Sequence, residues 1–415
     1  MTTLRLLDSA GAVTDAELRE GGGYSRPAAP LVSRVAYAAA HVVPKVHADN
    51  TPGQPADIDW DSTLAFRRNV YSWGLGVADA MDTAQRNMGL DAAATRELIS
   101  RSAAEAASVG GALVVGVNTD HVADEVISLE QVIDAYKEQL HLTEDAGAGV
   151  VLMASRHLAR AARTADDYRR VYREVLAAAG KPVVLHWLGI AFDPSLGGYF
   201  GSADTDAAAA TLLQVIEYNR DKVSGVKMSL LDADAEIAVR EQLPESARMF
   251  TGDDFHYVGL IEGDERGHSD ALLGAFAALA PSASAAIQAL DRGDVAAYRD
   301  ILGPTEALSQ QVFAAPTYYY KTGVAFLSWL NGHQSAFQMV GGLHAARSLP
   351  HLGEIVRRAN ASGALERPEL AAARWHAMLA VNGVDFTSAK PAETETPAAS
   401  ATAVPDAADS VGLLA

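Results

Sequence analysis

In the sequence, short apolar stretches typical of β-strands buried on both faces alternate with segments that can form helices. The expected strands cover residues 34–43, 76–81, 113–117, 149–153, 182–187, 225–229, 248–251 and 270–273. The expected helices between them cover residues 59–72, 95–108, 129–145, 166–179, 207–220 and 233–242. Because parallel neighbouring strands need a crossover connection, this alternation predicts an α/β fold with a parallel sheet. Eight such units in about 250 residues predict a (β/α)8 TIM barrel.

The rest of the chain divides into three further regions. Residues 1–30 contain three consecutive glycines and a Pro-Ala-Ala-Pro segment, so we expect a loosely structured N-terminal lead-in. The barrel is expected over residues 31–280, followed by a C-terminal helical extension over residues 281–387 with helices at 283–293, 294–301, 304–314 and 351–361. Residues 388–415 are rich in Ala, Pro, Thr and acidic residues, which predicts a disordered tail.

Charge and composition exclude several classes of function. The net charge of −19 and the pI near 5.0 argue against binding of nucleic acids or anionic membranes, because both need clustered Lys and Arg. The absence of cysteine excludes disulfides, thiolate nucleophiles and Cys-ligated zinc. The first residues lack the pattern of a signal peptide, and no apolar run reaches the roughly 18 residues of a membrane span. We therefore expect a cytoplasmic protein that acts on small molecules.

Lys227 is the most informative single residue, because it lies where the expected strand 225–229 ends. Burial disfavours the charged ammonium and lowers the pKa of such an amine. A neutral amine at pH 7 attacks carbonyl carbons, which is the first step of Schiff-base catalysis. The alternative is a lysine whose stem lies along apolar surface while its ammonium reaches water.

Other polar residues gather at the same ends of the expected strands, where (β/α)8 barrels build their active sites. His186 falls on the strand before Lys227 at matching depth, so its imidazole could carry protons to and from an imine; the alternative is a core histidine bonded to a backbone carbonyl. Adjacent strand residues point to opposite faces, so His186 faces inward only if Trp187 does not. For the same reason, at most one of Asp253 and Asp254 after the seventh strand faces the barrel centre.

Two further patterns leave alternatives open. His47 and Asp49 resemble the first ligands of metal-dependent barrel hydrolases, although the Asn-Thr-Pro-Gly-Gln-Pro segment that follows favours a surface loop. A metal-dependent hydrolase or isomerase of a sugar-like substrate would combine them with His41, His186 and an acid from the seventh strand. A non-catalytic barrel that binds sugar or acts as a scaffold is the third possibility. The aromatic run at 317–321 and the segment at 329–334 are expected to pack in the helical core, or alternatively to line the barrel mouth.

Several motifs together resemble one group of enzymes. Val223-Ser-Gly-Val-Lys-Met-Ser229 resembles the Gly-Ile-Lys-Asp-Ser signature that carries the imine-forming lysine of the dihydrodipicolinate synthase / N-acetylneuraminate lyase superfamily. Lys181-Pro-Val-Val-Leu-His-Trp187 resembles the fifth strand of that family, and Met249-Phe-Thr-Gly-Asp-Asp254 resembles the Gly-Asp-Asp that ends its seventh. The similarity covers about residues 31–302. The helices after residue 303 exceed the usual family length, as expected of a divergent, poorly characterised branch.

The chain also departs from the family pattern. The catalytic tyrosine of the fifth strand is His186 here. The Gly-Thr-Thr-Gly-Glu loop after the second strand corresponds to Met81-Asp-Thr-Ala-Gln85, which keeps one hydroxyl at Thr83 and loses the other at Ala84. In the family those paired threonines help to hold the carboxylate of a 2-oxo acid.

The resemblance implies a lysine-imine lyase, aldolase or dehydratase that acts on a small 2-oxo acid or keto sugar. Lys227 would be the nucleophile and His186 the proton carrier. We expect no metal and no other cofactor, and a homo-oligomer such as a dimer or tetramer. The residues expected to bind the substrate are His41, Asp82, Thr83, Gln85, Asp253, Asp254 and His268.

Overall fold

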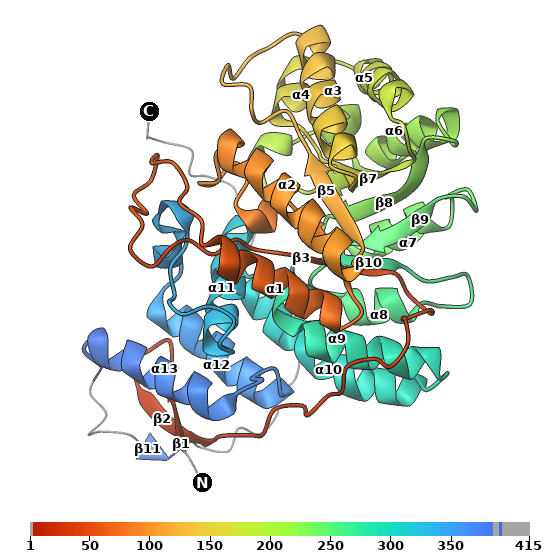
Figure 1. Ribbon diagram of the computed structural model, residues 1–415. Coiled ribbons are helices and arrows are strands. Elements are labelled where there is room, and N and C mark those ends of the chain that lie inside the picture. The colour runs from red at the N-terminus through yellow and green to blue at the C-terminus, as the bar shows by residue number, and fades with distance from the viewer. Residues whose placement is uncertain (1–2, 385–389, 392–415) are drawn as a thin grey trace.

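The computed structural model describes residues 3–384 and 390–391, and its centre is a closed barrel of eight parallel strands (Figure 1). In barrel order the strands are β10 (Asp270–Leu273), β3 (Ala36–Ala39), β4 (Gly76–Asp79), β5 (Leu113–Val117), β6 (Gly149–Leu152), β7 (Val183–Leu188), β8 (Val223–Ser229) and β9 (Arg248–Thr251). The predicted (β/α)8 barrel is therefore confirmed. Three of the eight strands have the expected bounds, whereas the first expected strand, 34–43, is shortened to the four residues of β3.

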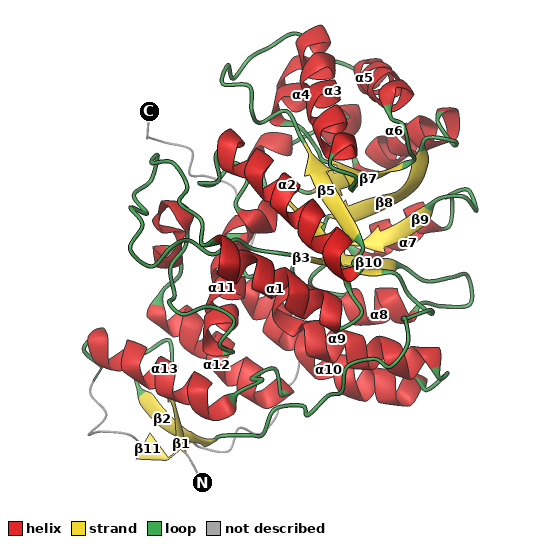
Figure 2. Ribbon diagram, in the orientation of Figure 1, coloured by secondary structure: helices red, strands yellow, loops and turns green. Residues whose placement is uncertain are grey.

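Helices cover the outside of the barrel and connect its strands (Figure 2). They are α1 (Trp60–Ser72), α2 (Ala92–Val109), α3 (Leu129–Asp145), α4 (Arg156–Ala161), α5 (Ala165–Ala178), α6 (Thr205–Tyr218), α7 (Ala233–Arg240), α8 (Tyr257–Glu262) and α9 (Ala275–Asp291). Local chemistry fixes their ends. The Asp59 side chain accepts a hydrogen bond from the Ser62 amide at the start of α1, and Ser128 forms a capping box with Gln131 at the start of α3.

Alternate residues of the strands face two apolar layers, one inside the barrel and one beneath the helices. On β7, Leu185 and Trp187 pack in the outer layer, whereas Val184 packs inside the barrel with Phe250. Because strand residues alternate, His186 shares the inner face with Val184. The condition for an inward-facing His186, namely an outward-facing Trp187, is met.

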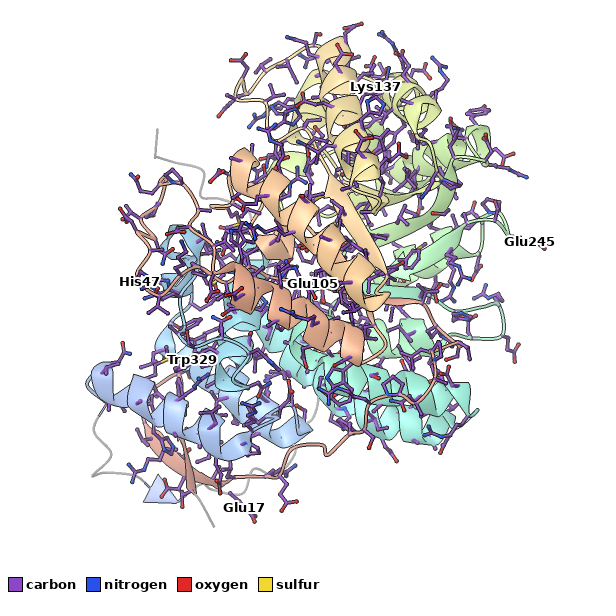
Figure 3. All side chains as sticks on the ribbon, viewed as in Figure 1. Glu17, His47, Glu105, Lys137, Glu245 and Trp329 are labelled. Carbon is purple, nitrogen blue, oxygen red and sulfur yellow. The ribbon has the colours of Figure 1, made fainter. Side chains whose placement is uncertain are left out.

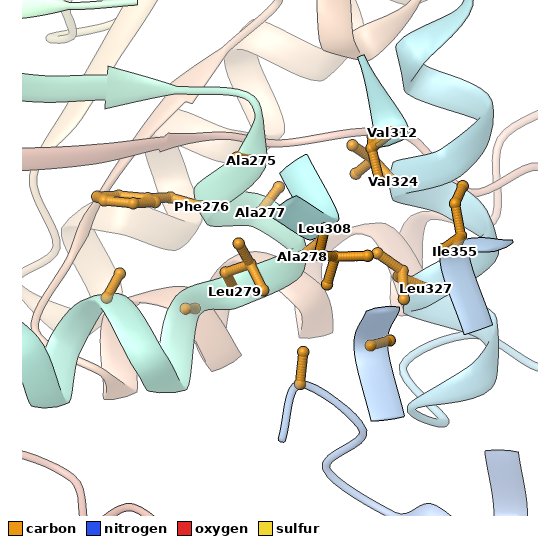
Figure 4. Close-up of a cluster of buried hydrophobic side chains, with 14 of the residues drawn as sticks. Ala275, Phe276, Ala277, Ala278, Leu279, Leu308, Val312, Val324, Leu327 and Ile355 are labelled. Carbon is orange, nitrogen blue, oxygen red and sulfur yellow. The ribbon is translucent and has the colours of Figure 1, made fainter. Parts of the chain in front are cut away.

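The C-terminal helices share one continuous core with a side of the barrel. They are α10 (Val295–Val312), α11 (Tyr320–Leu330), α12 (Leu349–Ser362) and α13 (Pro368–Val381). Figure 4 shows part of this core, with side chains from α9, α10, α11 and α12 in contact. The expected boundary at residue 280 falls next to a kink at Leu279 within α9, which runs from Ala275 to Asp291 and contains Pro281. The two helices expected at 294–301 and 304–314 are the single helix α10, which contains Pro304.

The N-terminal segment is more ordered than the sequence suggested. β1 (Thr3–Leu7) and β2 (Val13–Glu17) form an antiparallel hairpin beside α12 and α13 (Figure 1). The Trp375 indole donates a hydrogen bond to the Arg5 carbonyl, and Leu4 is fully buried. The expected disordered tail, 388–415, lies outside the described residues except for β11 (Lys390–Pro391), which pairs with β2. None of the helices within the described ranges is long and apolar enough to cross a membrane.

Candidate active site

Lys227 lies on the inner face of β8, and its side chain is only 7% exposed. The Cα atoms of His186 on β7 and Phe250 on β9 are its register partners, so the expected neighbouring position of His186 is found. Gly252, just after β9, leaves room for the lysine stem. A Cβ at that position would lie 2.7 Å from Lys227 Cε and would overlap the Ser229 hydroxyl. Glycine is therefore required for the lysine to reach the barrel mouth along this path.

Burial lowers the pKa of Lys227, and the carboxylates of Asp82 and Asp254 only partly oppose that shift. Burial also raises the pKa of Asp254 to about 8. One Asp254 oxygen accepts a hydrogen bond of 2.9 Å from the Ala275 amide. Desolvation therefore favours the neutral form of the amine and the protonated form of the carboxyl.

His186 is completely buried beside Lys227. Its Nε2 lies 3.2 Å from the Ser229 hydroxyl oxygen, and its Nδ1 has no hydrogen-bond partner among the described residues. Burial and then the charge of Lys227 hold the pKa of the imidazole well below its usual value. The ring is thus neutral near pH 7, with one nitrogen free to contact a substrate.

The two adjacent aspartates after β9 face different environments, as strand alternation predicts. Asp254 acts electrostatically on Lys227, as described above. Asp253 instead accepts hydrogen bonds from the amides of Phe255 and His256, and its second oxygen lies 3.0 Å from His256 Nδ1. Asp253 therefore holds the turn that leads into α8.

The residues after β4 also differ in their surroundings. The carboxylate of Asp82 makes no hydrogen bond or ion pair with a described side chain, but it acts electrostatically on Lys227. The Thr83 hydroxyl lies 2.7 Å from the hydroxyl of Tyr320. Gln85 donates to the carbonyls of Met88 and Val340, so it holds the loop together.

Tyr320 at the start of α11 brings the C-terminal region into the site. Its ring stacks on Phe313 at 4.4 Å between centroids, and it packs edge-to-face with Phe192 at 5.8 Å between centroids. Burial raises the pKa of the Tyr320 hydroxyl well above its usual value, and Asp82 and Asp254 raise it further. The Tyr320 hydroxyl is therefore neutral and keeps a proton that it can donate in a hydrogen bond. The aromatic run 317–321 is the sequence feature that could have indicated a role for Tyr320 in the site. From the sequence alone, core packing is the favoured interpretation of that run.

Two predicted substrate-binding histidines lie elsewhere. His41 Nε2 is 2.9 Å from Gln334 Oε1, its ring edge packs on Phe66 of α1, and burial lowers its pKa to about 4. His268 precedes β10, so it lies at the opposite end of the barrel, where the nearby charges are those of Arg34 and Asp270. The prediction for His268 was wrong because the side chain lies before the strand rather than after it.

The residues of the metal-dependent alternative are dispersed. Figure 3 shows His47 on a loop at the periphery of the molecule, where it is exposed. Asp49 accepts a hydrogen bond from the Thr51 hydroxyl at 2.6 Å. Within residues 3–384 and 390–391, no three His, Cys, Asp or Glu side chains are grouped as metal ligands.

A polar pocket of about 170 Å³ opens beside Asp82 at the C-terminal ends of β5, β6 and β7. Arg156 at the start of α4 lines it and pairs with Asp193 at 2.6 Å. Asp120 lines it as well and is bound by the buried guanidinium of Arg86. Further lining residues include Asn118, Thr119, His157, Arg160 and Leu188.

The barrel is similar to those of solved dihydrodipicolinate synthases. A putative synthetase from Pseudomonas aeruginosa is 15% identical, with a TM-score of 0.59 over 80% of this chain and 99% of that chain. The synthase from Aquifex aeolicus is 12% identical, with a TM-score of 0.58 over 86% and 100%. The 4-hydroxy-tetrahydrodipicolinate synthase of Methylacidiphilum fumariolicum is 14% identical, with a TM-score of 0.62 over 81% and 99%. The resemblance predicted from the strand-end motifs is thus confirmed as a shared fold.

Within this fold class, the chain belongs to the family described as "Protein of unknown function (DUF993)", whose model matches residues 4–384. A search of the curated proteins found no match. The family match extends through the barrel and the helices α10 to α13. The residues that α11 contributes to the site therefore lie within the matched region.

Proposed function

We propose that this protein is a lyase, an aldolase or dehydratase, that forms an imine between Lys227 and the carbonyl of a small 2-oxo acid or keto sugar. One observation carries the proposal: the Lys227 amine is buried at the carboxyl end of β8, with no ion-pair partner among residues 3–384 and 390–391. Burial lowers the pKa of such an amine and so favours the neutral form, whose lone pair can attack a carbonyl carbon.

Imine formation follows from the groups around the amine. The Lys227 nitrogen attacks the carbonyl carbon, and the carbonyl oxygen becomes a hydroxyl. The protonated carboxyl of Asp254 gives its proton to that hydroxyl, which departs as water. A protonated imine and an Asp254 carboxylate remain, so the new positive charge faces a new negative charge in a site of low dielectric.

The protonated imine then accepts electrons from a bond at the neighbouring carbon. Cleavage of a C–C bond gives an enamine and a carbonyl product, whereas loss of a β-hydroxyl gives water and an unsaturated imine. His186 and the Thr83–Tyr320 hydroxyl pair would carry the protons that these steps move. Addition of water to the imine returns the product and the free amine.

The remaining expectations stay predictions. We also propose a cytoplasmic location and a homo-oligomer, a dimer or tetramer. Gel filtration with light scattering would decide the subunit number.

Borohydride reduction followed by intact-mass measurement tests the proposed function. The protein would be incubated with pyruvate, longer 2-oxo acids and keto sugars, and at least one compound should add its reduced mass. Lys227→Met should remove the adduct. Lys222→Met is the matched control, because Lys222 lies at the start of the same strand and donates to the Ala179 carbonyl. The absence of any adduct, or an equal adduct in Lys227→Met, would contradict the proposal.

A further inference from the structure

A second buried lysine lies on α11, which packs against the Asp82–Ala84 turn of the candidate site. Lys321, the residue after Tyr320 on α11, is 2% exposed. Its Nζ lies 5.2 Å from the centre of the Tyr320 ring. The one acceptor for this amine among the described residues is the Met88 sulfur, at 3.2 Å. A thioether is a weak acceptor, so an amine with three donors is left without a strong partner.

The charges that act on Lys321 come from the polar pocket. They belong to Asp82, Arg156 and Asp193, all three of which line it. Burial lowers the pKa of the amine to about 8, so the ammonium form still predominates at pH 7. Asp82 acts electrostatically on both Lys227 and Lys321.

Most acids of the pocket already have a cationic partner. Asp120 is bound by Arg86, and Asp193 by Arg156 through Nε. The two Nη groups of Arg156 donate to none of the residues that the structure describes. Among the cations near the pocket, the Lys321 ammonium and the outer edge of Arg156 keep donors for a ligand, as does Arg160, which donates through Nη1 to the Glu125 carbonyl.

We propose that Lys321 and Arg156 form a subsite for an anionic group, a carboxylate or a phosphate, at the end of the substrate remote from the carbonyl that condenses with Lys227. The inference rests on the proposed function and narrows its substrate class to carbonyl compounds with a charged tail. An oxyanion supplies the acceptors that the buried ammonium lacks, and hydrogen bonds between charged groups are about twice as strong as neutral ones. A neutral hydroxyl would leave the ammonium uncompensated in its buried position.

Matched pairs of ligands test the subsite by borohydride trapping. Each pair differs at the tail: 2-oxo dicarboxylic acids against 2-oxo monocarboxylic acids of equal length, and dihydroxyacetone phosphate against dihydroxyacetone. For at least one pair, the ligand concentration that labels half of the wild-type protein should be at least tenfold lower for the member with the charged tail than for the member with the uncharged tail. The pair that shows this preference distinguishes a carboxylate tail from a phosphate tail.

Lys321→Met, which keeps the length and the apolar stem, should abolish the preference while the uncharged ligand still labels Lys227. Arg156→Gln, a change at a partly exposed side chain, should weaken the preference without endangering the fold. Lys222→Met should leave the preference unchanged. A wild-type protein that does not distinguish charged from uncharged tails, or a preference that persists in Lys321→Met, would overturn the inference.

Calorimetric titration with glutarate and inorganic phosphate separates this inference from imine chemistry, because neither anion has a carbonyl. Binding to the wild type and to Lys227→Met, with loss in Lys321→Met, would support the subsite even if no imine could be trapped. Trapping without any binding of these anions, and with no preference for charged tails, would leave the proposed function standing and refute the subsite.

Discussion

Replacing Glu236 with glutamine should stabilise the protein by an amount that grows as the pH rises from 5 to 8. Glu236 lies on α7 with a side chain that is 1% exposed. One carboxyl oxygen accepts a hydrogen bond from the Ser269 hydroxyl at 2.7 Å, and the other is buried and has no hydrogen-bond partner in the part of the chain that the structure describes. Burial, with a smaller contribution from the nearby Asp253 carboxylate, raises the pKa of Glu236 from 4.5 to about 8.

The magnitude follows from linkage between protonation and folding. Between pH 4.5 and pH 8 the folded protein holds the Glu236 proton and the unfolded chain does not, so this group stabilises less as the pH rises. Each pKa unit corresponds to about 1.36 kcal/mol, so the full shift corresponds to roughly 5 kcal/mol. Glutamine keeps the shape and the acceptor for Ser269 but has no proton to lose. The variant should therefore gain roughly 2–3 kcal/mol over the wild type between pH 5 and pH 7.

Urea denaturation of both proteins at pH 5, 6, 7 and 8 would measure this difference. The difference between the two free energies of unfolding isolates Glu236, because all other titrating groups are common to both proteins. A difference that stays constant over this range would refute the reasoning, since it would mean that the carboxyl titrates alike in the folded and unfolded states.

Three further predictions concern the barrel and the site. Asp79 on β4 forms a fully buried ion pair with Arg67 of α1 at 2.7 Å, so Asp79→Ala leaves the guanidinium without its anion and should cost about 3–5 kcal/mol in urea denaturation; a loss below about 1 kcal/mol would show that the pair does not stabilise the barrel. Tyr320→Phe removes the partner of the Thr83 hydroxyl, so exchange of the ligand's α-hydrogens in D2O should slow roughly 100-fold while the adduct still forms. Unchanged exchange would show that the tyrosine moves no proton. Gly252→Ala should destabilise the protein by about 1–3 kcal/mol through overpacking and displace the Lys227 stem, so that borohydride no longer traps a ligand. Trapping at the wild-type level would show that the stem takes another path.

The fold could be predicted because each barrel unit carries its own local signal. The strand 113–117 and the helix 129–145 were predicted with their observed bounds, since a buried apolar run and a capped helical period are visible in a few residues. The hairpin of β1 and β2 was missed because its partners are distant: Arg5 meets Trp375 at a separation of 370 residues.

In the candidate site, too, local features could be predicted from the sequence and distant contacts could not. The pairing of His186 with Lys227 followed from strand register, and the division between Asp253 and Asp254 followed from strand alternation. Tyr320 could not be placed, because its contact with Thr83 spans 237 residues and depends on how α11 packs on the barrel. No periodicity in the sequence reports such a contact.

Peptide mapping of the borohydride-reduced adduct tests the central claim most directly, because the site contains two buried lysines on different elements. The account predicts that the reduced ligand is found on the peptide that contains Lys227 and that the Lys321 peptide is unmodified. An adduct on Lys321, or on any lysine other than Lys227, would contradict the assignment of the nucleophile.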